Sequence, residues 1–266
     1  MNTYDFQTIN LSISNELCVL TFNRPEKLNS LNSQMHDEIR QAFKEIKRNK
    51  RIRCLLITGN GRGFCTGQDL SDRVVSAEDE APDLSASIEK NYNQHIRNIT
   101  TLPMPVVCAV NGVAAGAGAN IALACDLVFA SKSASFIQSF NKLGLVPDSG
   151  GTWMLPKLIG HARAMRLCLL GEKVTASSAL EMGMISYVCD DESLLDEATA
   201  LATQLSKAPT KGLSLIKRAI QVSHDNTLDE QLDLERDMQG TAGRTDDYRE
   251  GVAAFMAKRE PNYQGK

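Results

Sequence analysis

The chain has 266 residues, of which 42% are hydrophobic, and its formal net charge is −3. This length and composition are enough for one large domain, or a domain with a small appendage, that folds around its own core. The charges are scattered, so no basic stripe indicates nucleic-acid binding, and no apolar run approaches the roughly 20 residues that span a bilayer. Since the amino terminus also lacks a signal-peptide pattern, we expect a cytoplasmic protein that does not enter a membrane.

The cysteines and histidines offer little for metal or redox chemistry. The seven cysteines are widely spaced, and most stand inside apolar runs, which is typical of buried reduced thiols. The four histidines form no HExxH motif, and no CxxC motif occurs. We therefore expect no metal site.

Apolar patterns in the first half of the chain predict strands that alternate with helices. Two β-rich runs around a short polar turn predict a hairpin, an amphipathic stripe predicts a helix, and continuous apolar runs predict buried strands. In chain order these segments are the strands 9–14 and 17–22, the helix 35–46, and the strands 54–58, 105–110 and 126–130. The alternation indicates an α/β fold.

The segment 71–93 interrupts this pattern. It is acidic and polar, contains Pro82, and has no strong period until a helix that we expect to begin near Leu84. Long polar loops of this kind often lie over functional sites, so we interpret the segment as a mobile flap beside one.

Strands alternate with helices until about residue 191, and only helical patterns follow. The predicted segments are the strands 134–138 and 184–189, a helix after Asp148, apolar helical stripes at 194–205 and 213–220, and helices at 227–240 and 245–258. The last helices are too polar to form a domain of their own. Their apolar stripes favour packing against the main body or a second subunit, so we expect a homo-oligomer.

Two turns of small residues, 64–70 and 112–119, each follow a predicted buried strand. Small side chains let a ligand approach backbone N–H groups, and in the second turn these groups also begin a helix, where negative charge is favoured. If the two turns face one point, they can form an oxyanion hole. The alternative is that Gly116, Ala117 and Gly118 only permit close packing of helix on strand, and the residues alone leave both possibilities open.

Nucleotide binding fits these turns less well. The sequence GAGAN follows a strand and begins a helix, but Ile121 replaces the third glycine of GxGxxG and no earlier βαβ unit is predicted. The turn 59–63 lacks the Gly-Lys-Ser/Thr ending of a P-loop. We rank both nucleotide hypotheses below the oxyanion hole.

Asp148 is the only acid in the apolar, glycine-rich stretch 143–153. Burial there would raise its pKa toward that of a useful general base. The alternative is an N-cap for the following helix, and the residues alone slightly favour it. We interpret Asp69 and Asp126 as turn residues that bind local backbone amides.

The chain resembles the crotonase (enoyl-CoA hydratase/isomerase) superfamily over essentially its whole length. The motifs that carry the resemblance, in order, are NRPEKLNSL at 23–31, GNGRGFCTGQDL at 59–70, AVNGVAAGAGA at 109–119 and GLVPDSGGT at 144–152. Within the family, FCTGQDL, LGLVPDSGGTW, LDLERD and DYREGVAAFMAKR are similar to the isomerases of phenylacetate catabolism, which act on ring-1,2-epoxyphenylacetyl-CoA.

This resemblance implies an α/β crotonase (ClpP-like) fold, a spiral of ββα units followed by helices that build trimers or pairs of trimers. It therefore implies a core with a coenzyme A site over 1–191 and a helical trimerisation region over 192–266. The expected partners are an acyl-CoA substrate and further copies of the chain. No separate cofactor is implied, since coenzyme A is part of the substrate.

The resemblance also assigns candidate site residues by position. It places the oxyanion amides on Thr66 and Ala117, with Gly116 as the alternative if the register differs by one, and the catalytic acid on Asp148. The implied substrate and coenzyme A contacts are Arg24, Lys27, Leu28, Thr66, Gly67, Gln68, Asp69, Leu70 and Phe140, with Phe255 and Lys258 reaching a neighbour's coenzyme A.

The two glutamates that handle water in family hydratases fall here on Asn120 and Phe140, neither of which can transfer a proton. A double-bond shift needs only one base that removes and returns a proton, so the expected function is an acyl-CoA isomerase with Asp148 as that base. The expected reactions are an alkene shift in an enoyl-CoA and ring expansion of an epoxide to an oxepin.

Three alternatives remain. One is an enoyl-CoA hydratase. Another is an aryl-CoA dehalogenase with Asp148 as nucleophile, although Phe140 stands where that enzyme has Trp and no helper histidine is obvious. The third is a non-catalytic coenzyme A-binding scaffold, which would have little reason to keep an acid at Asp148.

Overall fold

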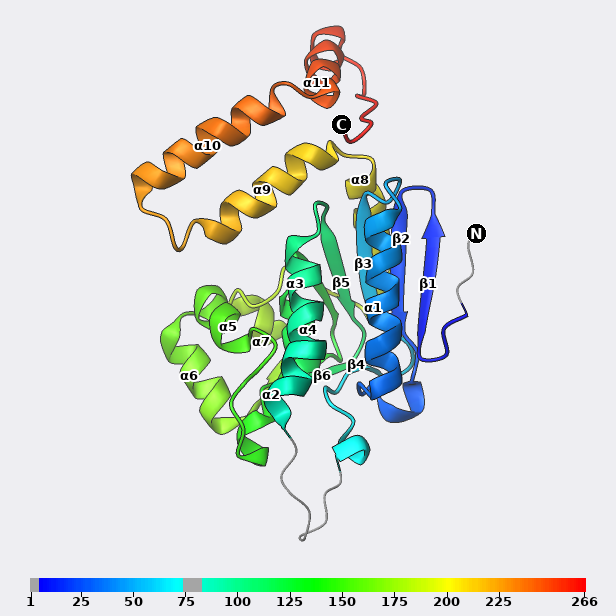
Figure 1. Cartoon of the computed structure of the whole chain (residues 1–266), viewed down its shortest axis with the longest axis vertical. Helices are drawn as coiled ribbons and strands as arrows, with labels where there is room; N and C mark the ends of the chain where they lie inside the picture. Colours follow the sequence, from blue (N-terminus) through cyan, green and yellow to red (C-terminus); the bar gives the residue numbers. More distant parts are fainter. Residues whose placement is uncertain (1–4, 74–82) are drawn as a thin grey trace.

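The computed structural model describes residues 5–73 and 83–266 and contains two sheets (Figure 1). The predicted hairpin begins the larger sheet, where β1 and β2 pair antiparallel and the later strands add in parallel. In spatial order the strands are β1 (Ile9–Ser14), β2 (Leu17–Phe22), β3 (Cys54–Gly59), β5 (Val106–Val110), β7 (Leu127–Ser131) and β10 (Tyr187–Cys189). This sheet confirms the predicted strand positions, except that β10 is three residues long and begins after the predicted residue 184.

A smaller sheet of short strands lies next to the larger one. Its order is β4 (Gly63–Cys65), β6 (Val113–Ala115), β8 (Ser135–Ile137) and β9 (Lys173–Thr175), with β9 antiparallel to β8. Only β8 was expected, because three-residue strands are too short to show a period in the sequence. The sheet matters for the site, since β4 and β6 carry the two turns of small residues.

Helix α1 (Ser33–Arg48) covers one face of the larger sheet because its apolar positions recur at helical spacing. Met35, Ile39, Phe43 and Ile46 are all buried against the sheet, as the stripe predicted. The Asn32 side chain accepts a hydrogen bond from the Met35 N–H at 2.9 Å and so caps the helix.

The other helices of the main body follow the alternating pattern. In chain order they are α2 (Leu84–Ser87), a π-helix (Ile88–Asn93), α3 (Gln94–Thr101), α4 (Ala117–Leu123), α5 (Gly151–Ile159), α6 (His161–Leu170) and α7 (Ala176–Glu181). Short 3-10 helices also occur at Pro25–Lys27, Leu70–Arg73 and Ser139–Leu143. The start of α2 at Leu84 confirms the predicted helix there. Residues 74–82 of the predicted 71–93 flap lie outside the described residues.

Helix α8 (Leu194–Ser206) covers the second face of the larger sheet. Leu194, Ala198 and Ala202 pack in a buried cluster with Leu56 of β3 and Phe129 of β7. The packing of the core therefore continues past residue 191, although the predicted boundary placed this helix with the tail.

Three helices extend away from the sheets at one end of the molecule (Figure 1). They are α9 (Thr210–Val222), α10 (Leu228–Ala242) and α11 (Asp246–Ala257), and they confirm the helical pattern predicted after residue 192. Apolar side chains on them remain exposed, including Ile220, Leu228 and Phe255. These three helices are called the tail below.

Two further findings concern the whole of the described chain. No helix among residues 5–73 and 83–266 is long and apolar enough to cross a bilayer. All seven cysteines are free thiols, and six of them are buried, as predicted. Burial raises the pKa of the Cys18, Cys54 and Cys65 thiols to about 12, so these groups stay protonated and packed.

Candidate active site

A cavity of 340 Å³ lies where the turn after β4 meets the start of α4. It is lined by eight of the residues that the sequence analysis singled out: Thr66, Gly67, Gln68, Leu70, Gly116, Ala117, Phe140 and Asp148. Five further residues complete it: Leu84, Tyr92, Ser139, Leu143 and Leu145. Both turns of small residues and the candidate acid therefore face one space, which we call the central cavity.

The two turns touch because glycine leaves room between them. A Cβ at Gly118 would lie only 2.1 Å from the Cys65 carbonyl oxygen, so α4 begins directly against the end of β4. At Gly67, where φ is +81°, a Cβ would lie 3.3 Å from the Ala117 nitrogen. The sequence left two roles open for the glycines: close packing of helix on strand, and access of a ligand to backbone amides. In the structure the same glycines serve both roles.

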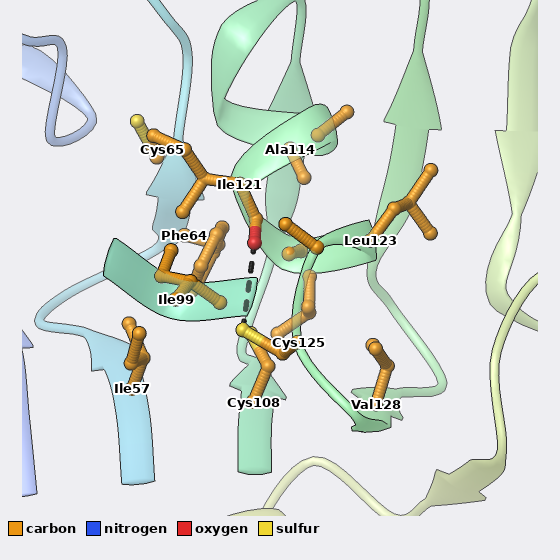
Figure 2. Close-up of a cluster of buried hydrophobic side chains, with 14 of the residues drawn as sticks. Ile57, Phe64, Cys65, Ile99, Cys108, Ala114, Ile121, Leu123, Cys125 and Val128 are labelled. Atoms are coloured by element: carbon orange, nitrogen blue, oxygen red, sulfur yellow. Dashed lines mark hydrogen bonds between the residues drawn. The ribbon is translucent and has the colours of Figure 1, made fainter. Parts of the chain in front are cut away.

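A buried apolar cluster holds the end of β4 against the start of α4. Figure 2 shows Phe64 and Cys65 of β4 gathered with Ile121 of α4 and Cys108 of β5. The Cys125 thiol donates to the Ile121 carbonyl at 3.4 Å and holds the end of α4. Since interiors of this kind are close-packed, the two turns have little freedom to separate.

The Gln68 backbone N–H faces the cavity side because of how its neighbours pair. Leu31 donates to the Gly67 carbonyl at 2.7 Å and accepts from the Asp69 N–H at 3.0 Å. In a parallel pairing the residue between two bonded neighbours directs its own N–H and C=O to the opposite side. Within the described residues, neither the Gln68 nor the Ala117 amide donates to another backbone carbonyl outside regular helices and strands.

These contacts correct the predicted oxyanion pair. The Thr66 N–H donates to the Leu28 carbonyl at 3.2 Å, so it is already satisfied, and the Gly116 N–H donates to the Ile137 carbonyl at 2.8 Å. The prediction for Thr66 and the alternative for Gly116 are therefore wrong, because a bonded amide is not available to a substrate oxygen. Gln68 and Ala117 are the available pair, so the candidate donor of the first turn moves from Thr66 to Gln68, two positions further along the chain.

Asp148 lines the same cavity, half-buried, before α5. Its carboxylate accepts a hydrogen bond from the Ser149 hydroxyl at 2.9 Å. The N-cap of α5 is Gly150, which has no side-chain cap, so the N-cap interpretation of Asp148 is wrong. Ser149 and Gly150 both have positive φ, 52° and 76°, and this turn leaves the carboxylate on the cavity wall.

Asn120 anchors the backbone of Asp148 from α4. It is fully buried, and its amide nitrogen donates to the Asp148 carbonyl at 2.8 Å. Its side-chain oxygen accepts from Gln138 Nε2, also at 2.8 Å. A Cβ on Gly151 would meet the Asn120 side chain at 2.4 Å, so the fit is close. Asn120 thus connects the acid to the helix that carries the Ala117 amide.

The segment proposed to hold coenzyme A is joined to the cavity by an ion pair. The Arg24 guanidinium donates to the Asp69 carboxylate at 2.9 Å and to the Ser30 carbonyl at 2.6 Å. Hydrogen bonds from Ser71, together with Arg24, lower the pKa of Asp69 to about 2. Arg24 and Asp69 therefore form an ion pair with each other. Lys27 is the exposed cation of this segment.

Phe255 belongs to α11 and Lys258 is its C-cap, and α11 lies at the end of the molecule opposite α2 (Figure 1). Phe255 is 80% exposed, so it touches little of its own chain. Their predicted contact with a neighbour's coenzyme A stays a prediction.

Sequence patterns did not indicate Tyr92 or the two buried histidines, His36 and His95, that lie behind it. Tyr92 belongs to the π-helix, and its hydroxyl donates to Gln68 Oε1 at 2.9 Å. His36 of α1 packs edge-on against the Tyr92 ring, and His36 Nδ1 lies 2.9 Å from His95 Nε2. The sequence contained only a weak indication of this group. The two histidines are 59 residues apart and look like ordinary core residues, and a tyrosine in an acidic loop looks like a surface residue.

Comparisons with known proteins identify the family of this chain. A family model described as enoyl-CoA hydratase/isomerase matches residues 12–266. A 1,2-epoxyphenylacetyl-CoA isomerase of Escherichia coli (strain K12) is 58% identical over 247 residues, which are 93% of this chain and 94% of that protein. A trans-2-decenoyl-acyl-carrier-protein isomerase of Streptococcus mutans is 36% identical over 264 residues, 98% of this chain and 100% of that protein. The crystal structure of an enoyl-CoA hydratase from Bacillus anthracis superposes with a TM-score of 0.91 at 30% identity, covering 98% of this chain and 100% of that one.

Proposed function

The chain belongs to the enoyl-CoA hydratase/isomerase family, and we propose that it isomerises coenzyme A thioesters without adding water. The observation that carries this proposal is the composition of the central cavity. Two available backbone amides, those of Gln68 and Ala117, line one cavity with a single carboxylate, that of Asp148. This set suits the removal and return of one proton.

The proposed reaction is a proton transfer through an enolate. Asp148 takes a proton from the carbon next to the thioester carbonyl, and the electron pair moves onto the carbonyl oxygen. The Gln68 and Ala117 amides stabilise that negative oxygen, each contributing roughly 3 kcal/mol to the transition state. When the enolate collapses, Asp148 returns the proton further along the acyl group, so the formula of the substrate is unchanged.

The substrate that we propose is 1,2-epoxyphenylacetyl-CoA, the compound named for the Escherichia coli relative. Proton removal next to the thioester would form a double bond to the ring as the epoxide expands to an oxepin, and the proton would return to a ring carbon. The apolar lining, including Phe140, Leu143 and Leu145, suits an aromatic ring. A shift of the alkene in an aliphatic enoyl-CoA uses the same steps.

The environment of Asn120 argues against hydration. Adding water across a double bond needs groups to activate the water and to protonate carbon. Here both ends of the Asn120 amide are engaged with Gln138 and Asp148, and Phe140 is apolar. Asp148 is then the acid that remains for proton transfer among the residues that line the cavity.

We also propose assembly into trimers or hexamers, a cytoplasmic location, and no cofactor besides the coenzyme A of the substrate. The exposed apolar side chains of the tail support assembly, since single chains rarely leave so many uncovered. Seven free cysteines agree with a reducing compartment.

The decisive experiment follows the mass of the substrate in heavy water. The purified protein is incubated separately with a 3-enoyl-CoA, a 2-enoyl-CoA and 1,2-epoxyphenylacetyl-CoA, and products are analysed by mass spectrometry. We expect isomerisation with deuterium exchange next to the carbonyl and no gain of one water. A product heavier by one water would overturn the proposal and establish a hydratase.

A further inference from the structure

We propose that Tyr92 is a positioning residue for this reaction, because its hydroxyl fixes the Gln68 side chain and thereby aims the Gln68 backbone amide at the substrate oxygen. The inference deepens the proposed function and rests on it for the identity of the reaction. It assigns a role to a residue that lines the cavity without being an acid, a base or an oxyanion donor.

The Gln68 side chain is held at both ends. Its Oε1 accepts from the Tyr92 hydroxyl at 2.9 Å. Its Nε2 donates to the Leu31 carbonyl at 3.2 Å and to the Asp69 carbonyl at 3.1 Å. Both donors and one acceptor site of the amide group are therefore used, which leaves a single orientation for the side chain.

These three hydrogen bonds of the Gln68 side chain, called the clamp below, hold the peptide that carries the oxyanion amide. Gly67, which precedes Gln68, has φ of +81° and no side chain to hold it. The peptide between Gly67 and Gln68 is therefore positioned mainly by the pairing with Leu31 and by the Gln68 side chain. A rotation of this peptide by a few tens of degrees would misdirect the N–H, and hydrogen bonds weaken steeply when they bend.

Tyr92 is suited to act as the fixed end of the clamp. It is 2% exposed and lies in a π-helix, a rare insertion that is frequent at functional sites. The His36 ring lies 4.7 Å from the Tyr92 ring at 81°, and His36 stacks in turn on His95. The Tyr92 ring is therefore fixed by packing, so its hydroxyl can direct Gln68 with little freedom of its own.

The test is Tyr92→Phe in the full chain, which keeps the ring and removes only the hydroxyl. We expect kcat to fall about tenfold with KM within a factor of two, since the lost bond affects the transition state more than binding. Tyr187→Phe is the matched control. Tyr187 of β10 stacks on Phe129 of β7 and is not among the residues that line the cavity. That variant should keep the wild-type kcat.

A double-mutant cycle separates positioning from direct contact with substrate. Gln68→Met removes the same clamp from the other side, so Tyr92→Phe should change kcat by less than twofold in a Gln68→Met background. If Tyr92 acts on the substrate directly, it will cost the same tenfold in both backgrounds, and the proposal is then wrong.

Hydrogen exchange tests the clamp without any substrate. In the ligand-free protein, the peptide that contains Asp69 should exchange about tenfold faster in Tyr92→Phe than in wild type, whereas Tyr187→Phe should not differ. Unchanged exchange would overturn the clamp whatever the reaction is. A wild-type protein that turns over no coenzyme A thioester, with faster exchange in Tyr92→Phe, would instead overturn the proposed function and leave the clamp standing.

Discussion

The two walls of the central cavity are built in different ways. The amide wall consists of the turn 66–68, the start of α4 and Tyr92, and most of its residues are buried. The acid wall consists of residues 139–150, and its rim is open, with Leu143 56% and Val146 78% exposed. One wall is part of the core, whereas the other is a short 3-10 helix (Ser139–Leu143) followed by a loop that Asn120 anchors to the core.

This difference separates the fixed backbone amides from the more open wall, which carries both the acid and the apolar rim. Amides that stabilise an enolate must be held in fixed directions, and packing of the two turns against the buried core does that. A wall that contacts a variable acyl group, or a neighbouring subunit, gains from an exposed apolar rim. The predictions below test that division, beginning with the largest expected effect.

Gly118→Ala should damage the amide wall most. The new methyl group would lie 2.1 Å from the Cys65 carbonyl oxygen, so α4 and β4 must separate. We expect a soluble yield far below wild type, or a folded protein with turnover reduced more than 100-fold. Gly212→Ala is the control, because a methyl there meets nothing within 4 Å, and it should keep full turnover. Normal turnover in Gly118→Ala would show that the two turns need not touch.

Asp148→Asn should abolish most of the turnover and leave the fold intact. A positioned base contributes about 10²–10⁴-fold to rate, and the amide keeps the shape of the side chain, including the contact with Ser149. We expect turnover to fall by that factor while the melting temperature, the oligomeric state and coenzyme A affinity remain those of wild type. Retained activity in a steady-state assay would eliminate the single-base mechanism.

Asn120→Leu tests the anchor between the two walls. It leaves the buried Asp148 carbonyl and Gln138 amide without their partner, which should cost about 2 kcal/mol of unfolding free energy. We expect turnover to fall roughly tenfold as well, because the acid loses its fixed backbone. Asn226→Leu, in the turn between α9 and α10, is the matched control for both urea unfolding and kinetics.

Acid should lower the unfolding free energy through His95, which is buried beside His36 behind Tyr92. Burial, with smaller contributions from His36 and Arg40, lowers the pKa of His95 to about 3. In the unfolded chain His95 takes up a proton below about pH 6.5, so acidification favours unfolding across the interval from 6.5 to 3. Between pH 7 and pH 5 this group should cost about 2 kcal/mol of unfolding free energy.

Replacing the histidine should remove that dependence. In His95→Gln we expect the loss of unfolding free energy between pH 7 and pH 5, measured with urea, to be smaller by about 2 kcal/mol than in wild type. His161→Gln, at an exposed position, should behave like wild type. An equal pH dependence in wild type and His95→Gln would show that His95 is not buried in its neutral form in solution.

Much of the fold followed from local patterns. The hairpin, α1, the buried strands and the helical tail were predicted, because apolar residues at periods of 2 and 3.6 determine which face an element buries. Strands β4, β6 and β9 were missed, since three residues cannot show a period. The role of α8 was also missed, because an apolar stripe does not reveal which surface it covers.

The site was predicted in part. Asp148, Ala117 and Phe140 were singled out, and they line one cavity with both turns. The oxyanion donor of the first turn was placed on Thr66 rather than Gln68, because an extended segment alternates its N–H groups between two sides and sequence does not show which side is already paired. Asn120 was noted only as a missing glutamate, although it is the anchor of Asp148.

The sequence by itself determined the family, the kinds of element and the small residues that allow two turns to meet, since these depend on composition and on contacts within a few residues. Only the tertiary structure decided which amides remain available, which side chain holds the acid, and that Tyr92 reaches Gln68 from 24 residues away along the chain. These features depend on distances between elements that are remote in sequence, and such distances are set by packing of the whole core.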